Sequence, residues 1–234
     1  MATSNVKVLG AWPSPFVSRV RMALKIKSVD YELIEVNPQE KSELLIKSNP
    51  VHKKIPVLFH GDKRICESLI IVQYIDEVWT DGPSILPSDP YDRAIARFWA
   101  AYIDEKWFPT MKQLETASGD EERATVVGKV LEGFALLEEA FAKCSKGKAF
   151  FGGDNVGYLD IALGCFLGWV KVAEIIGGGK LLDESKFPGL AGWAERFLSH
   201  DVAKDTVPDA MKILEFFGKV QAARAAAAAT TAAE

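Results

Sequence analysis

Residues 49–58 read NPVHKKIPVL, and the two prolines mark where a helix ends and a strand begins. Asn49-Pro50 stops the short helix predicted from Ser42 to Lys47, because proline cannot continue a helix. Pro56 then enters a strand that runs from Pro56 to Phe59. A cis bond between Ile55 and Pro56 would turn the Ile55 backbone outward to pair with an extended ligand. Most X–Pro bonds are trans, so this segment carries weight only beside other features.

The segments on either side predict an α/β unit. Val6 to Ala11 and Tyr31 to Val36 are predicted strands, separated by a helical pattern. On the other side, Gly61-Asp62 predicts a turn into a strand at Arg64 to Cys66. The helix that Ser68 is predicted to cap keeps apolar residues at helical spacing. The order βαβαββα predicts a mixed sheet covered by helices.

Thr80 to Pro90 marks a domain boundary, because it contains Gly82 and three prolines in eleven residues. We therefore predict an α/β domain at residues 1–80, a linker at 81–90, an all-helical domain at 91–221 and an alanine-rich tail at 222–234. Five segments of the second half carry helical periodicity. They are Tyr91–Gln113, Glu121–Lys143, Tyr158–Ile175, Leu190–Leu198 and Met211–Val220.

Composition excludes several classes of protein. Among 234 residues, 48% are hydrophobic and 26% charged, and the net charge of -4 argues against a nucleic-acid binder. The longest apolar run, Ile161 to Val170, is about half of a membrane span, and the N-terminus lacks a signal pattern. The three cysteines form no CxxC pair, and no histidine lies near them at metal-ligand spacing. We expect a cytoplasmic chain without a metal site or membrane partner.

Polar residues occupy two junctions between a strand and a helix. Ser14 precedes a proline, and Glu67-Ser68 opens the helix after the hairpin. The simplest interpretation is that both serines cap helices. Alternatively, Ser68 and its helix N-terminus hold a carboxylate while Glu67 holds an adjacent ammonium. Lys41, Lys53 and Lys54 would then be placed to hold a second carboxylate.

Several motifs together resemble the plant tau-class glutathione transferases, over a length from about Val6 to Val220. The resemblance implies a thioredoxin-like N-terminal domain that binds glutathione, and an all-helical domain that completes a site for hydrophobic electrophiles. It also implies a homodimer. The motifs are WPSPFV at 12–17, RVR at 19–21, NPVHKKIPVL at 49–58, ICESL at 65–69, PSDPY at 87–91 and RFW at 97–99.

The resemblance implies a role for each polar position. Ser14 matches the residue whose hydroxyl bonds to the glutathione sulfur. The implied glutathione contacts are Lys41 and Lys54 for the glycyl carboxylate, Ile55 with Pro56 for the cysteinyl backbone, and Glu67 with Ser68 for the γ-glutamyl end. These residue types match the two carboxylates and one ammonium of glutathione.

One serine hydroxyl suffices for the implied chemistry. Lowering a thiol pKa from about 8.5 by two units needs roughly 2.7 kcal/mol of preference for the anion. A hydrogen bond to a charged group contributes about 1.5–3 kcal/mol, and a helix N-terminus adds about 0.3–1 kcal/mol. Ser14 would act as a donor to the sulfur anion, so neither a histidine partner nor a cofactor is required. Because related thiol oxidoreductases carry cysteine here, serine disfavours that activity.

The electrophile site draws on aromatic residues, which are as often core as pocket. The resemblance places in this site Trp12, Pro13, Phe16, Phe108, Lys112, Trp169 and Phe216. Gly157 to Asp160 resembles the family's folding motif. Gly157 cannot form a reciprocal capping box, but Asp160 can still bind free amides of that turn.

We predict a glutathione transferase that joins the glutathione thiolate to hydrophobic electrophiles, with glutathione-dependent peroxidase activity as a possible addition. One alternative is a ligandin-like carrier of hydrophobic metabolites or glutathione conjugates without turnover. Another is a structural or regulatory module. An intact Ser14 favours turnover over the carrier, and the presence of both Ser14 and Glu67 disfavours the module.

Overall fold

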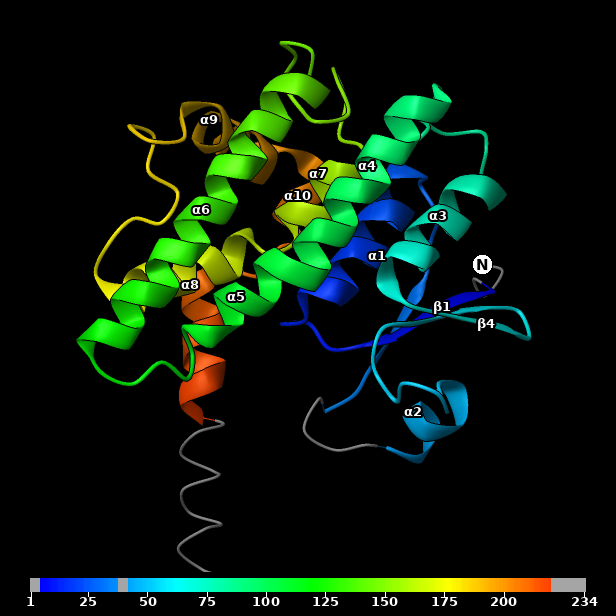
Figure 1. The fold of residues 1–234 in the computed structure, drawn as a ribbon. Coiled ribbons are helices and arrows are strands. Elements are labelled where there is room, and N and C mark those ends of the chain that lie inside the picture. The colour runs from blue at the N-terminus through cyan, green and yellow to red at the C-terminus, as the bar shows by residue number, and fades with distance from the viewer. Residues whose placement is uncertain (1–4, 38–41, 220–234) are drawn as a thin grey trace, which may run out of the picture.

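The computed structural model describes residues 5–37 and 42–219, which form a small α/β unit beside a larger group of helices (Figure 1). The predicted order of the first part is confirmed. It comprises β1 (Val6–Gly10), α1 (Pro15–Ile26), β2 (Glu32–Glu35), α2 (Glu43–Ser48), β3 (Val57–His60), β4 (Lys63–Cys66) and α3 (Ser68–Val78).

The four strands form one mixed sheet in the order β2-β1-β3-β4. β1 is parallel to β2 and antiparallel to β3, and β3 forms the predicted hairpin with β4. Because side chains alternate along a strand, Val8 packs into the main core while its neighbour Leu9 packs with Leu45 of α2. The sheet is therefore covered on one face by α1 and α3 and on the other by α2.

The second part is helical, as the sequence predicts. Residues 210–219 are also helical, and the predicted tail at 222–234 lies outside the described residues. The preceding helices of this part are α4 (Pro90–Tyr102), the π-helical segment η1 (Ile103–Trp107), α5 (Phe108–Gln113), α6 (Asp120–Cys144), α7 (Tyr158–Gly164), α8 (Leu167–Gly177), α9 (Pro188–Ser199) and α10 (Asp201–Lys204).

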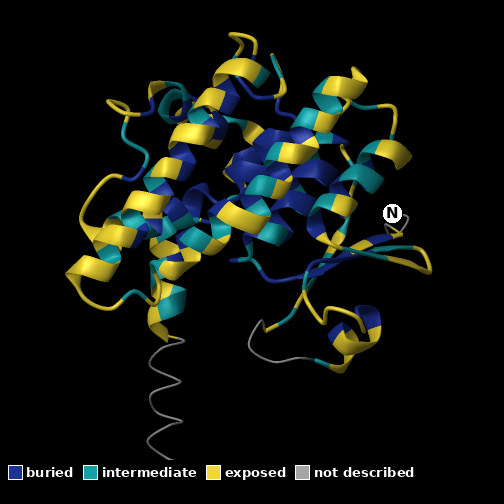
Figure 2. Ribbon diagram, in the orientation of Figure 1, coloured by how far each residue is buried: buried dark blue, intermediate teal, exposed yellow. Residues whose placement is uncertain are grey.

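Two predicted helices are interrupted. The helix predicted at Tyr91–Gln113 contains η1, where the Phe108 amide bonds to the Ile103 carbonyl. Pro109 follows directly and has no amide hydrogen, so the ordinary helical bonding cannot continue through it. The helix predicted at Tyr158–Ile175 divides into α7 and α8. Its residues up to 168 are all buried, so no polar stripe marks the change of direction (Figure 2).

Asp160 organises the start of α7. Its Oδ1 accepts hydrogen bonds from the Phe151 amide at 2.9 Å and Trp193 Nε1 at 2.7 Å, and its Oδ2 accepts from the Gly152 and Gly157 amides at 2.8 Å each. The prediction that Asp160 binds free amides of this turn is confirmed for Gly157, whereas its other donors lie outside the turn. Burial raises the pKa of Asp160 to about 6, against the opposing effect of the four donors. The carboxylate is therefore ionised at neutral pH.

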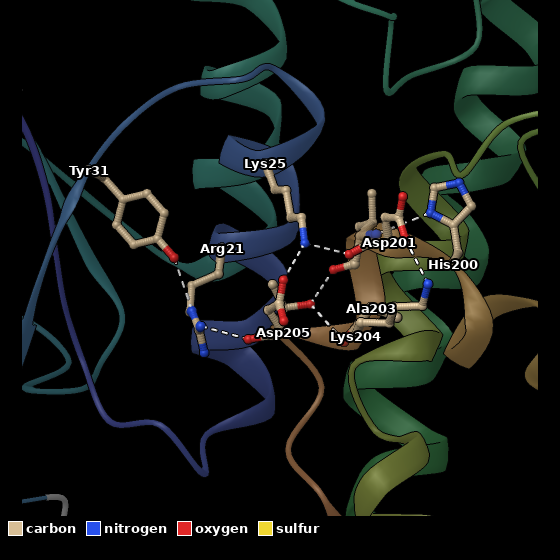
Figure 3. Close-up of polar contacts among 10 residues, drawn as sticks. Arg21, Lys25, Tyr31, His200, Asp201, Ala203, Lys204 and Asp205 are labelled. Atoms are coloured by element: carbon tan, nitrogen blue, oxygen red, sulfur yellow. Dashed lines mark hydrogen bonds and ion pairs between the residues drawn. The ribbon is translucent and has the colours of Figure 1, made fainter.

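Two ionic contacts lie at the C-terminal end of α1. Lys27, the C-cap residue of α1, pairs with Asp76 of α3 at 2.7 Å, and Asp76 also accepts the Ile85 and Leu86 amides. On the outer face of α1, Lys25 pairs with Asp205 at 2.7 Å, just beyond α10 (Figure 3). The first pair is buried and fixes the segment between the two parts, whereas the second is exposed and contributes little.

No helix among the described residues is long and apolar enough to span a bilayer. The domain boundaries at 80 and 90 stay a prediction.

Candidate functional site

Ser14 occupies the N-cap of α1, as the sequence predicts. Its Oγ accepts a hydrogen bond from the Val17 amide at 3.4 Å, and Pro15 is the first helical residue. The side chain is half-buried. Because the oxygen acts as acceptor in this contact, the hydroxyl hydrogen is left to donate elsewhere. The positive end of the α1 dipole lies at the same place.

The segment 49–58 adopts the conformation that the sequence suggested. The Ile55–Pro56 bond is cis. Ile55 lies before Val57, where the pairing of β3 with β1 begins, so its backbone stands outside the ladder. Asn49 is buried and donates to the Lys54 carbonyl at 2.9 Å. Lys54 is exposed, and Lys41 lies outside the described residues.

The sequence-based expectation for Ser68 as a helix cap is wrong. Glu67 holds the N-cap position of α3, at φ 69°, and Ser68 is the first helical residue. The Ser68 hydroxyl is buried and accepts a hydrogen bond from Arg19 Nη1 at 3.2 Å. A non-glycine residue at such a φ costs about 1–3 kcal/mol and is commonly kept at functional sites. Glu67 is half-exposed there, with His52 Nε2 at 3.8 Å.

A buried guanidinium connects Ser68 to the helical part of the chain. Arg19 is fully buried and forms two hydrogen bonds with Asp104 of η1, at 2.8 and 2.6 Å. It also donates to the Ala162 carbonyl at 2.7 Å and lies about 5 Å from the ring centres of Phe16 and Phe166. Burial opposes the charge of Arg19, but Cys165 and Asp104 raise its pKa overall. The arginine is charged and holds α1, α3, η1 and α7 together.

Sequence reasoning did not single out Arg19 for a role of its own, although a signal was present. Phe16, Val20 and Ala23 form an apolar stripe on α1, and Arg19 falls within it at helical spacing. A charged residue inside an apolar stripe is buried only when it is paired. The partner Asp104 lies 85 residues away, so sequence alone does not identify it.

Asp104→Asn is expected to lower the free energy of unfolding by about 2 kcal/mol, because Arg19 would remain buried with weakened compensation for its charge. Thermal unfolding measures the effect. Asp92→Asn is the matched control, since Asp92 pairs with the exposed Lys146 at 2.7 Å. This variant should lower the free energy of unfolding much less. Equal losses in the two variants would contradict this role for Asp104.

An apolar cavity of ≈ 460 Å³ lies between α5, the start of α6, α8 and the helix at 210–219. Phe108, Lys112 and Trp169 line it, together with Phe217. Phe216, which sequence reasoning placed here, instead packs against Trp12 with ring centres 5.6 Å apart. Helical spacing alone does not decide which of two adjacent phenylalanines faces a cavity.

Two contacts join this cavity to the Ser14 segment. Trp169 Nε1 donates to the Pro13 carbonyl at 3.1 Å, and the rings of Phe16 and Phe108 lie 5.4 Å apart. Of the predicted electrophile-site residues, Phe108, Lys112 and Trp169 line the cavity, and Pro13 and Phe16 contact two of them. Trp12 and Phe216 pack against each other and do not line it. Their roles toward a ligand stay predictions.

Comparison with known proteins gives the family. Residues 4–77 match the N-terminal domain of glutathione S-transferases, and residues 120–196 match the C-terminal domain. The chain is 58% identical to glutathione S-transferase U17 of Arabidopsis thaliana, over 94% of this chain and 97% of the relative. It is 61% identical to the crystal structure of a tau-class glutathione S-transferase from mango, with a TM-score of 0.90 over 93% of this chain and 99% of that chain. The chain belongs to the tau class of glutathione S-transferases.

This transferase also resembles a rice glutathione S-transferase solved in complex with glutathione. The two chains are 35% identical, with a TM-score of 0.84 over 94% of this chain and 99% of the rice chain. Within residues 5–37 and 42–219 of the transferase, no group of three or more histidine, cysteine or acidic side chains is arranged to hold a metal ion.

Proposed function

We propose that this transferase activates glutathione at Ser14, whose hydroxyl donates a hydrogen bond to the thiolate sulfur. The observation that carries the proposal is the position of Ser14 at the N-terminus of α1, half-exposed and with its hydroxyl hydrogen uncommitted among the described residues. The hydrogen bond and the helix dipole both favour the anion. Together they supply the roughly 2.7 kcal/mol needed to lower the thiol pKa by two units.

The rest of the peptide would extend from Lys54 to Glu67. Lys54, with Lys41, is placed to attract the glycyl carboxylate, and the unpaired backbone of Ile55 bonds to the cysteinyl unit. Glu67 holds the γ-glutamyl ammonium. Ser68 accepts from Arg19, so its own hydroxyl hydrogen stays available for the neighbouring carboxylate. The Arg19 contact thus supports the orientation of that hydroxyl.

The acceptor would enter the apolar cavity beside Phe108 and Trp169. The thiolate forms a carbon–sulfur bond with an electrophilic carbon of the acceptor. In a displacement, the bond to a leaving group such as chloride breaks and the group departs with the electron pair. In an addition, the electron pair of a double bond is protonated instead. The thiol proton goes to solvent.

An assay with glutathione and a chromogenic aryl halide tests this function directly. Turnover that depends on Ser14 is the expected result, and binding of glutathione without turnover would favour the carrier interpretation. Glutathione-dependent reduction of hydroperoxides, which starts from the same thiolate, stays a prediction.

The free thiols of Cys66, Cys144 and Cys165 agree with the reducing cytoplasm as the proposed location.

We also propose that two copies of the chain pair through α3 and α4. Ile70 of α3 is 56% exposed and Phe98 of α4 is 60% exposed, although both are large and apolar. The two helices lie side by side (Figure 1), and Arg97 of α4 donates to Gln73 of α3 at 2.8 Å. Neighbouring exposed apolar residues of this kind are typical of a protein–protein interface.

Phe98→Glu is therefore expected to convert the dimer to a monomer, because it would place a charge in the apolar centre of the interface. Sedimentation velocity measures the change. Leu136→Glu is the control, since Leu136 is 45% exposed on α6 and belongs to neither pairing helix. A Phe98→Glu variant with unchanged mass in solution would place the interface elsewhere.

A further inference from the structure

Arg123 is a cation with no assigned task. It lies in the first turn of α6, is only partly exposed, and lines the apolar cavity. Within the part of the chain that the structure describes, no acidic side chain comes within ion-pair distance of it. Arginine remains protonated at all physiological pH values, so Arg123 presents a permanent positive charge to the cavity. An anion that enters the cavity would supply the missing partner.

Arg123 lies at the end of the cavity away from the Ser14 segment. Phe108, which contacts Phe16, begins α5, and Leu114 follows the end of the same helix. Leu114 and Arg123 both also line a smaller adjoining cavity of ≈ 270 Å³. α5 has six residues and is therefore about 9 Å long, so its two ends lie about that far apart.

The charged residues that line the cavity do not balance one another. Lys112 and Arg123 are positive and Glu115 is negative among the lining residues, so the lining carries a net positive charge. The adjoining cavity adds Asp120 and Lys180, which are of opposite sign. Lys112 and Glu115 are both exposed, so solvent screens them more than Arg123. The cavity wall between the two ends is mostly apolar.

We propose that the electrophile site takes hydrophobic acceptors with a terminal carboxylate, which Arg123 binds. The apolar body of the acceptor would lie along the cavity wall, between the reacting carbon and the carboxylate. A guanidinium recognises a carboxylate through two parallel hydrogen bonds. This inference rests on the proposed conjugation at Ser14 and specifies its acceptor.

The reaction with such an acceptor is an ordinary conjugate addition. The sulfur anion forms a bond to the β-carbon of an α,β-unsaturated aldehyde, and the electron pair of the carbon–carbon double bond shifts to give an enolate. A proton from solvent then adds to the α-carbon, replacing the proton that the thiol released. No leaving group, oxidant or reductant takes part, and the terminal carboxylate is unchanged.

The test compares two acceptors in steady-state kinetics. One is an α,β-unsaturated aldehyde whose saturated chain ends in a carboxylate, and the other is its methyl ester. Arg123→Gln is expected to raise KM for the carboxylate about tenfold, because a charge-assisted hydrogen bond is lost. The variant's kcat for the carboxylate and both constants for the ester should change less than about twofold. Arg123→Lys should retain most of the preference, since it keeps the charge.

Lys129→Gln is the matched control, because Lys129 is exposed on the same helix and does not line the cavity. Unchanged carboxylate kinetics in Arg123→Gln, or an equal loss with both acceptors, would overturn the assignment of Arg123. If only Lys112→Gln weakened the kinetics with the carboxylate acceptor, Lys112 would be the residue that binds the carboxylate. That result would also overturn the assignment of Arg123. Absence of turnover with both acceptors in the parent protein would instead count against the proposed conjugation itself.

Discussion

Ser14→Ala is expected to lower kcat/KM for conjugation about 10- to 100-fold near neutral pH, because the thiolate loses a charge-assisted hydrogen bond. The dependence on pH should change as well. The thiolate disappears as the pH falls below the thiol pKa, so the rising limb of the profile should move upward by about one to two units, toward the free thiol value of about 8.5. Stopped-flow or steady-state rates between pH 5 and 9 measure both effects.

Two controls separate the hydroxyl from the helix cap. Ser14→Thr keeps both a hydroxyl and a capping oxygen, and is expected to retain most of the rate. Isothermal titration should show that Ser14→Ala still binds glutathione, since the contacts at Lys54, Ile55 and Glu67 are unchanged. A profile that keeps its position on the pH axis in Ser14→Ala would refute the proposed role.

Asp160→Ala is expected to lower the free energy of unfolding by about 4 kcal/mol, because three backbone amides and the Trp193 indole lose their acceptor inside the protein. For a chain of this length the melting temperature should fall by about 10 °C. The KM for glutathione in the folded variant should change less than about twofold, since Asp160 is not among the proposed ligand contacts. Thermal unfolding and steady-state kinetics provide the two readouts.

Asp89→Ala is the matched control for this effect. Asp89 caps α4 by accepting the Tyr91 and Asp92 amides at 2.9 Å, but it is exposed. Water can replace Asp89 as the acceptor, so the free energy of unfolding should fall by only about 1 kcal/mol. A fully stable Asp160→Ala variant that had lost glutathione binding would reverse the structural assignment of Asp160.

Local features of the fold were predictable because neighbouring residues decide them. Ser14 and Pro15 lie within one turn of the start of α1, and Gly61-Asp62 lies in the hairpin that joins β3 and β4. The same reasoning failed at Ser68. A serine before an apolar helix is typical of a cap, but Glu67 takes that position and the Ser68 hydroxyl meets Arg19, 49 residues away in the chain.

The candidate site also contains some features that the sequence indicated and others that it did not. The sequence indicated that Trp12, Pro13, Phe108 and Trp169 belong together, through the resemblance to a family. It did not indicate that Phe217 would line the cavity in place of Phe216, or that Arg123 would lie there without an acidic partner in the described part of the chain. Adjacent positions on a helix point about 100° apart, so small rotations of a packed helix decide which one faces a cavity.

By itself, the sequence determined the order of strands and helices in the α/β part, the proline before β3 and the serine at the start of α1. Periodicity, turn residues and caps depend on interactions between residues that are close together in the chain, so the sequence alone contains their physical cause. Only the tertiary structure decided that Arg19 would be buried against Asp104 and that Arg123, with no acidic partner among residues 5–37 and 42–219, would line an apolar cavity. Those outcomes depend on the packing of helices far apart in the chain, where burial converts an ordinary surface charge into one that requires a partner.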